Sequence, residues 1–258
     1  MPFPFPVLDC PPGNWKDIFD NQAILAIALN VCSNMAIAHN MFIRGINAVY
    51  AQAEGIKKDQ VKPFVFFCVS FLGMIHHHHH LEETLLFPFF ETKLGAKAME
   101  HNVEQHHEFM DRLNDLEKYL KEVQAGKVSY NGTTIIEKLD TFSDSLVQHL
   151  ADEIPTLESS KMRAAFTVKE LEVFEAEFGK RILKEVSLSI DLPLGFICHD
   201  KSTAPHFPPL PTPVMWLAKY GLFRLHSDAW AFGPCDVHGV VKPGLGNDSQ
   251  LPSAQANA

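Results

Sequence analysis

The sequence has few basic residues, few cysteines and no long unbroken apolar run. It contains 22 lysines and arginines against 31 aspartates and glutamates, which gives a formal net charge of -9 over 258 residues. A nucleic-acid-binding surface needs a net basic face to replace the counterions on phosphate, so this balance argues against a nucleic-acid partner. The apolar stretches 23–38 and 63–75 are shorter than the ~18 to 20 apolar residues of a membrane-spanning helix. We therefore expect buried helices and no membrane partner.

Other common signatures are also missing. The five cysteines are widely spaced and form no C-x-x-C pair, which argues against a disulfide framework or a zinc ribbon. The first ten residues carry no basic group and place prolines where the apolar core of a secretory leader would run, so we expect a cytoplasmic protein. The sequence has no glycine-rich phosphate loop, nucleophile elbow or Ser/His/Asp spacing, and kinase, nucleotide-dependent dehydrogenase and serine hydrolase activities have no support.

The residues that are present predict an all-α protein. Hydrophobic side chains make up 46% of the chain and include 20 phenylalanines, enough to bury a sizeable core. Apolar side chains recur at helical spacing in four long segments joined by short connections. Such helices predict an up-down-up-down four-helix bundle. The four predicted helices span residues 21–53, 61–87, 98–124 and 134–154.

We expect further segments around this bundle. A fifth amphipathic helix is predicted at 168–186, a proline-rich strap at 205–213 and a short helix at 214–225. The strap has the composition of an extended, polyproline-like segment. The predicted division of the chain is an N-terminal strap at 1–20, the metal-binding bundle at 21–158, an additional helix and extension packed on the bundle at 159–243, and a flexible tail at 244–258.

The most informative segment is a run of five histidines followed by Leu-Glu-Glu, at 76–83. A purification tag stands at a terminus beside a linker, whereas this run lies between apolar helical sequences, so we interpret it as part of a helix. Residues four apart share one face of a helix, which makes His78 with Glu82, and His79 with Glu83, alternative chelating pairs. Neither alternative is excluded by the spacing.

A second H-x-x-x-E pair, His149 with Glu153, lies in the segment 134–154. Two antiparallel helices can each offer an imidazole nitrogen and a carboxylate to a shared interior point. No thiolate belongs to the set, and mixed imidazole and carboxylate ligands favour iron, manganese or zinc. Two bridging carboxylates would favour a pair of metal ions.

Five motifs connect these pairs with a known family: AHNMFIRGIN at 38–47, H-x-x-x-E-E-x-x-L-F-P at 78–88, VEQHHEF at 103–109, H-x-x-x-E at 149–153 and WAFGPCD at 230–236. With these motifs the sequence resembles the hemerythrin-like, or HHE cation-binding, proteins, most of all fungal members with a C-terminal extension. The resemblance implies a bundle that holds a non-haem di-iron centre with two bridging carboxylates. The ligands that it implies are His39, His78, Glu82, His106, His149 and Glu153.

The sequence departs from the family pattern on the third helix, where Met110 stands four residues after His106 in place of a second histidine. A thioether is a poor ligand for iron, so we expect one metal to have fewer protein ligands. Alternatively, Met110 is a core residue and His107 or His101 substitutes, although His107 is rotated by about 100° from His106 on a helix. The sequence is compatible with a site for two metal ions and with a site for one.

Helix lengths give an independent check. His39 and His78 both stand roughly 21 to 26 Å from the connection between the first two helices, at about 1.5 Å per residue. His106 and His149 stand roughly 22 to 27 Å from the connection between the third and fourth. The predicted ligands therefore lie at one level of the bundle. For the neighbours Arg44 and Asn47 we expect a structural role.

A metal with these ligands can carry dioxygen, activate it for oxidation of an organic substrate, or report iron or oxygen status through folding. The loss of a histidine at Met110 and an extension of roughly 70 residues past the fifth helix favour an oxygen-using non-haem iron oxidoreductase acting on a small organic molecule, with the extension roofing its cavity. The alternative is a non-catalytic oxygen- or iron-binding, storage or sensing protein. The sequence names no catalytic residue, substrate or protein partner.

Overall fold

The computed structural model describes residues 5–8, 23–157, 159–203 and 210–245. Most of the predicted N-terminal strap, the first part of the proline-rich segment and the tail after 245 lie outside these residues. Within them the protein is helical, and the only β pairing is an isolated bridge between Cys235 and Val241. The predicted all-α class is confirmed. None of the described helices is long and apolar enough to cross a lipid bilayer.

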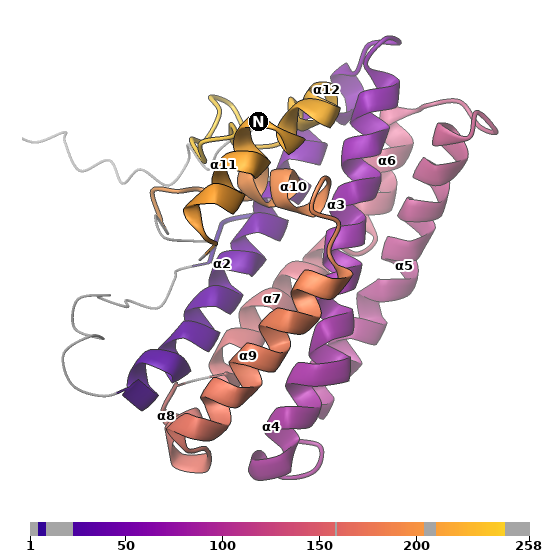
Figure 1. Cartoon of the computed structure of the whole chain (residues 1–258). Helices are drawn as coiled ribbons and strands as arrows, with labels where there is room; N and C mark the ends of the chain where they lie inside the picture. Colours follow the sequence, from indigo (N-terminus) through magenta and orange to yellow (C-terminus); the bar gives the residue numbers. More distant parts are fainter. Residues whose placement is uncertain (1–4, 9–22, 158, 204–209, 246–258) are drawn as a thin grey trace, which may run out of the picture.

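Four long helical columns form the bundle (Figure 1). The first column is α2 (Ala23–Gln52), and the third is α5 (Glu100–Gln124). The second column begins as α3 (Val61–Leu81), continues through the π-helical segment η2 (Glu82–Leu86), and ends as α4 (Phe87–Leu94). The fourth column consists of α6 (Gly132–Asp140) and α7 (Ser143–Thr156). Short connections make neighbouring columns antiparallel, as the sequence predicted.

The second column is longer than predicted because the helix continues past Pro88. Proline has no N–H group, and in a regular α-helix its ring collides with the carbonyl four residues earlier. The wider π turn that precedes Pro88 makes room for the proline ring. In this turn the Phe87 N–H donates to the Glu82 carbonyl, five residues earlier. A π segment also rotates the residues that follow it around the helix axis. Glu82 and Glu83 stand at the beginning of this segment.

The fourth column is interrupted between α6 and α7, where a single helix over 134–154 was predicted. At the break, the Thr141 hydroxyl donates to the Lys138 carbonyl (2.7 Å) and the Ser143 hydroxyl donates to the Leu139 carbonyl (2.8 Å). Such bonds from hydroxyl groups compete with the helical hydrogen bonds. The backbone of Phe142 is not helical, and its side chain is 1% exposed. The buried ring therefore anchors the break between α6 and α7 in the core.

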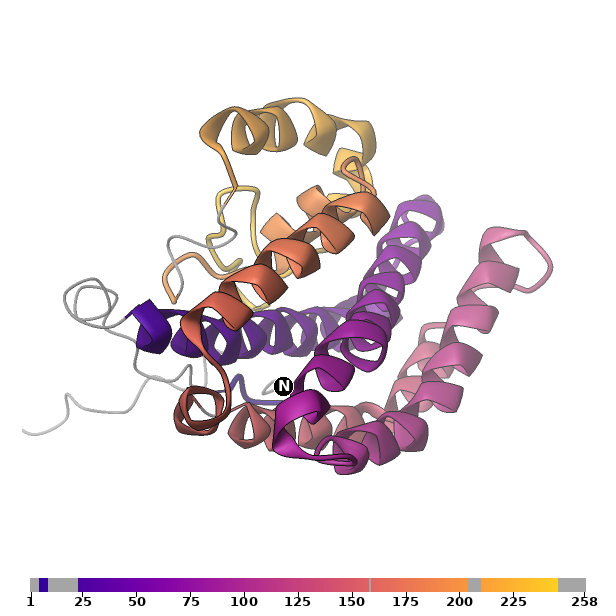
Figure 2. The same cartoon turned by 60° about the horizontal axis from the view of Figure 1, so that its bottom comes forward.

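Two further helices cover one side of the bundle. After α8 (Ser159–Ala165), Thr167 caps α9 (Val168–Glu185) through a reciprocal capping box with Glu170, which satisfies backbone groups at the helix start. Phe89 of α4 stacks on Phe174 of α9 with ring centroids 4.0 Å apart. Of the described side chains of α9, only Leu171 is fully buried. This helix therefore lies on the bundle surface rather than in its core (Figures 1 and 2).

The extension comprises α10 (Asp191–Cys198), α11 (Thr212–Tyr220), the 3-10 segment η3 (Leu222–His226) and α12 (Ser227–Trp230). Trp230 is fully buried and its ring lies 5.8 Å from that of Phe66, near the start of α3. Buried side chains of α10, among them Leu194 and Ile197, belong to the same hydrophobic core as the bundle helices. One hydrophobic core therefore continues from the bundle into the extension, across the boundary predicted after residue 158.

Residues 5–8 run along α2 and are held by two asparagines. The side chain of Asn47 bonds to both the N–H (3.3 Å) and the carbonyl (2.7 Å) of Phe5. The side chain of Asn40, two turns earlier, does the same with Leu8, at 2.6 and 2.9 Å. Asn47 thus has the structural role that was expected, and Arg44 faces Asp200 of the extension at 3.7 Å.

The contact between α2 and α3 yields a stability prediction. A methyl group added at Gly45 would overlap the ring of Phe71, which is 1% exposed, whereas one added at Gly73 in the middle of α3 meets no atom. Gly45→Ala should lower the free energy of unfolding by about 1–3 kcal/mol through overpacking. Gly73→Ala, the matched control, should raise it by about 0.5–1 kcal/mol. Chemical denaturation of the two variants would measure both effects, and equal stability would contradict this packing.

Candidate metal centre

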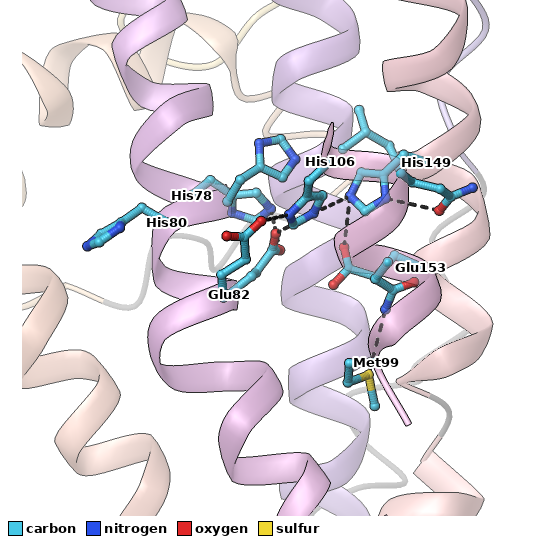
Figure 3. A network of polar contacts seen from close by, with 12 residues as sticks. His78, His80, Glu82, Met99, His106, His149 and Glu153 are labelled. Atoms are coloured by element: carbon cyan, nitrogen blue, oxygen red, sulfur yellow. Dashed lines mark hydrogen bonds and ion pairs between the residues drawn. The ribbon is translucent and has the colours of Figure 1, made fainter. Parts of the chain in front are cut away.

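Seven polar side chains from all four columns meet in the interior of the bundle. Figure 3 shows five of them, His78, Glu82, His106, His149 and Glu153, pointing toward one another, whereas His80 points away. The seven are His39 from α2, His78 and His79 from α3, Glu82 from η2, His106 from α5, and His149 and Glu153 from α7. All are buried, with a side-chain exposure of 0–1%, except His78 at 17%.

These side chains form two groups that share Glu82. In each group, one ligand atom per residue lies within 4.8 Å of all the others. One group is His79, Glu82, His106 and His149, and the other is His39, His78, Glu82 and Glu153. One oxygen of Glu82 lies 2.7 Å from Nε2 of His78 and the other lies 3.6 Å from Nε2 of His106. The carboxylate therefore stands between the two groups.

Glu153 faces both groups as well. Its Oε2 lies 3.2 Å from Nε2 of His39 and 3.8 Å from Nε2 of His149. Two carboxylates placed between two sets of imidazole nitrogens are the arrangement of di-metal carboxylate sites in helix bundles. Each of the two groups could hold a cation.

Two of the imidazoles are oriented by backbone carbonyls. The Nδ1–H of His39 donates to the carbonyl of Leu150 at 2.8 Å, and that of His79 donates to the carbonyl of Ile75 at 3.0 Å. A carbonyl can only accept, so the proton is on Nδ1 in both rings. In the neutral form of each ring, Nε2 then carries the lone pair, and it faces the other groups of the centre, as in metal-binding histidines.

The other two oriented imidazoles use side chains as acceptors. Nδ1 of His106 lies 2.7 Å from a carboxylate oxygen of Glu83, and Nδ1 of His149 lies 3.2 Å from the amide oxygen of Gln105. The amide nitrogen of Gln105 donates to Asp152 at 2.9 Å, which fixes the orientation of that amide. With both Nδ1 atoms protonated, the Nε2 lone pairs of His106 and His149 face each other at 3.0 Å.

A bound cation would resolve what is otherwise an unfavourable arrangement. Neither oxygen of Glu82 nor of Glu153 accepts a hydrogen bond, and Nε2 of His39 and of His79 have no hydrogen-bond partner. Burying such groups unpaired costs several kcal/mol, whereas coordination to a metal satisfies them all. Nitrogen and oxygen donors without a thiolate suit a first-row divalent metal. The residues present therefore fit the metal centre that the sequence predicts.

Burial also sets the protonation of these groups. It lowers the pKa of His149 to about 2, helped by the nearby His106 and His39. Burial, followed by the other histidines, lowers the pKa values of His78 and His79 well below the usual range. Imidazoles that stay neutral are ready to bind a metal. Burial, then the charge of Glu153, raises the pKa of Glu82 well above its usual value, and a bound cation would counteract this shift.

The six ligands implied by the family resemblance all lie at this centre, together with His79, which the sequence spacing had offered as an alternative. The alternative pairing of His79 with Glu83 is not seen, because Glu83 lies behind His106 and contacts its outer nitrogen. His101 and His107 are exposed and do not join either group. Met110 is half-buried and packs against the main hydrophobic core.

The sequence analysis missed Gln105 and Asp152. Each precedes a predicted ligand by one residue. Hydrogen bonds run from Nδ1 of His149 to Gln105, from Gln105 to Asp152, and from Asp152 to Gln148, whose amide donates to Asp152 at 2.7 Å. The only sequence signal is their position beside His106 and Glu153. Whether such neighbours meet depends on how α5 and α7 are rotated about their axes.

Residues 32–157 match the hemerythrin HHE cation-binding domain. The dimeric xanthone biosynthesis cluster protein R11 of Cryptosporiopsis sp. (strain 8999) is 30% identical over 242 residues, covering 92% of this chain and 88% of that relative. The chain belongs to the hemerythrin HHE cation-binding family. All seven side chains of the centre lie within the matched range. The similarity to the xanthone-cluster protein extends beyond the hemerythrin domain into the extension. No solved structure gives a significant match.

The unpaired groups of this hemerythrin domain predict a strong dependence of stability on metal. A ligand present at about 100 times its dissociation constant stabilises the folded state by about 2.7 kcal/mol. For a chain of this size, removing that ligand should lower Tm by about 5–10 °C. Differential scanning calorimetry of iron-loaded protein with and without a chelator would measure the difference. The Tm of His149→Ala should fall less on chelation, because this variant lacks one proposed ligand. Equal Tm values for loaded and chelated wild-type protein would contradict the prediction.

Proposed function

We infer that this hemerythrin domain would hold two iron ions, with Glu82 and Glu153 as the carboxylates between two sets of histidines, and that the iron pair would supply dioxygen chemistry for the oxidation of a small organic molecule. The observation that carries this proposal is the pair of ligand groups sharing Glu82. His39 and His78 would serve one ion, and His106 and His149 the other. Iron is favoured over zinc and manganese by the family resemblance and is compatible with the donor set.

When bound, an iron pair supplies the electrons for dioxygen chemistry, which imidazole and carboxylate groups cannot do. The protein side chains orient the centre and exclude water from it. The ring of Phe42 lies 4.8 Å from that of His78, and the ring of Phe109 lies 5.1 Å from that of His79. Both phenylalanines are buried. These apolar walls strengthen electrostatic interactions inside the site and keep out competing water.

The two groups differ in access. His78 is 17% exposed, whereas its partner His39 and the ligands of the other group are closed off. The adjacent His77 contacts Glu185 at the end of α9 at 3.2 Å. We therefore propose that dioxygen and substrate approach from the side of the bundle along which α9 runs, and that the ion beside His78 is the one that they reach.

This route differs from the expectation that the extension roofs the centre. Residues 207–209 lie outside the described part of the chain, and Trp230 packs beside Phe66. Phe66 precedes His78 by twelve residues, which corresponds to about 18 Å along a helix. The described α12 therefore covers the other end of α3 rather than the metals.

The alternative function, oxygen or iron binding without catalysis, is favoured by one observation. Two hollows among the described residues lie away from the centre. One, of about 330 Å³, borders α5 at Glu117, and the other, of about 60 Å³, lies beside Phe196 and His199. The relative from a dimeric xanthone biosynthesis cluster favours an organic substrate instead, because a xanthone is a small aromatic molecule. We give more weight to this relative, since its similarity covers the extension as well as the metal-binding domain.

Elemental analysis tests the metal centre. Protein isolated from iron-supplemented cells should contain one to two irons per chain. Glu82→Ala and His149→Ala should each lower the iron content, because each removes a proposed ligand. Glu104→Ala, which alters an exposed carboxylate of α5, is the matched control and should leave the content unchanged. Stoichiometric zinc alone, or no metal after mild purification, would contradict an iron centre.

Oxygen consumption separates the oxidase from the carrier. Iron-loaded protein mixed with a reductant and a phenolic or xanthone substrate should consume dioxygen catalytically, followed with an oxygen electrode, and form an oxidised product detected by mass spectrometry. Glu82→Ala should abolish turnover by removing a bridging carboxylate. Reversible uptake of no more than one dioxygen per iron pair, with every substrate left intact, would support the carrier instead.

A further inference from the structure

The third column lacks the second histidine that the family pattern expects, and nothing else on α5 replaces it. Met110 occupies the position and is half-buried against the hydrophobic core. Its thioether is a poor ligand for iron. His107 and His101 are exposed and lie outside both ligand groups. Without a further ligand, the ion beside His106 would have only two imidazoles.

His79 stands where a third imidazole is needed. It is 1% exposed, and its ring centroid lies 4.5 Å from that of His106 and 5.3 Å from that of His149. One ligand atom of His79 lies within 4.8 Å of those of Glu82, His106 and His149. Its Nδ1–H is held by the carbonyl of Ile75 at 3.0 Å, which leaves the Nε2 lone pair for a metal. The side chain is therefore both close to the centre and in the required tautomer.

A purely structural role does not account for this histidine. A histidine that serves the core uses both ring nitrogens in hydrogen bonds, because an unpaired polar atom is costly to bury. Nε2 of His79 has no hydrogen-bond partner, and the ring of Phe109 lies 5.1 Å away. An apolar side chain would suit such a position better unless Nε2 binds a cation.

Helix geometry explains how neighbours can serve two ions. His78 and His79 are rotated by about 100° from each other around α3, so their rings leave the helix in different directions. Glu82 is four residues after His78 and three after His79, and both spacings place it on the next turn of the same face. One carboxylate therefore lies beneath two imidazoles, each directed toward a different ion.

We propose that His79 is the third imidazole ligand of the ion held by His106 and His149, so that α3 supplies the ligand that Met110 of α5 does not. The inference rests on the proposed metal centre. It gives one ion three imidazoles, from His79, His106 and His149, and the other ion two, from His39 and His78. Both ions share Glu82. The chain thus retains a two-metal site despite the departure from the family pattern.

Metal binding by His79→Ala tests the assignment. Anaerobic titration with Fe²⁺ should give two ions per chain for the wild type. In His79→Ala, one of these should be lost or bound at least tenfold more weakly, and added free imidazole should restore it by filling the vacated position. His80→Ala is the matched control, because His80 is a neighbouring histidine that points away from the centre (Figure 3). Two ions bound by His79→Ala with wild-type affinity would overturn the proposal.

A second measurement on the unaltered chain covers the case in which His79→Ala does not fold. Protein labelled with ¹⁵N-histidine is titrated with Zn²⁺, a diamagnetic probe that occupies the same donors. The Nε2 resonances of five histidines, including His79, should shift to the metal-bound range, and four without His79 would overturn the proposal. If the wild type binds neither Fe²⁺ nor Zn²⁺, the metal centre itself fails. Binding of two ions without His79 refutes only the present inference.

Discussion

The burial of two carboxylates without hydrogen-bond donors is the constraint on which the rest of the structure depends. Glu82 and Glu153 lie among five imidazoles, and their oxygens accept no hydrogen bond. In their neutral forms, the four imidazoles whose Nδ1 is hydrogen-bonded cannot donate to these oxygens, because their proton is on the outer nitrogen. A cation is the missing partner, and its binding energy is then also folding energy. The packed phenylalanines around the centre serve this arrangement by excluding the water that would otherwise solvate the carboxylates.

The local backbone is shaped to support the centre. Pro88 cannot complete a regular α-helix, and the π segment Glu82–Leu86 that precedes it lies directly at the bridging carboxylate. Isolated π turns are frequent at functional sites because they re-aim side chains within an otherwise regular helix. Here the neighbouring Glu82 and Glu83 both contact His106, at its inner and outer nitrogens. One segment of the second column thereby supplies a metal ligand and an anchor for another ligand.

The features that depend on residue spacing along one helix were predicted from the sequence. The side-chain contacts that depend on how neighbouring helices are rotated about their axes were missed. The third helix, predicted over 98–124, is observed as α5 from Glu100 to Gln124, and the four-residue spacing of His149 and Glu153 correctly indicated a shared face. The break at Phe142 was missed because hydroxyl groups beside it compete with helical hydrogen bonds. The contact of Gln105 with His149 and the presence of both His78 and His79 at the centre were not predictable. A shift of one residue turns a side chain by about 100° around the helix.

The unequal surroundings of the two proposed ions bear on where chemistry takes place. Three imidazoles and the closed interior around His79 and Phe109 would hold one proposed ion tightly and leave little access to it. The other ion would have two imidazoles, and one of them, His78, is the only group of the centre with substantial exposure. An open coordination position is useful only where a small molecule can arrive. His79, His106 and His149 would thus hold an ion that chiefly stabilises the fold, while His39 and His78 would hold the ion that a small molecule such as dioxygen can reach.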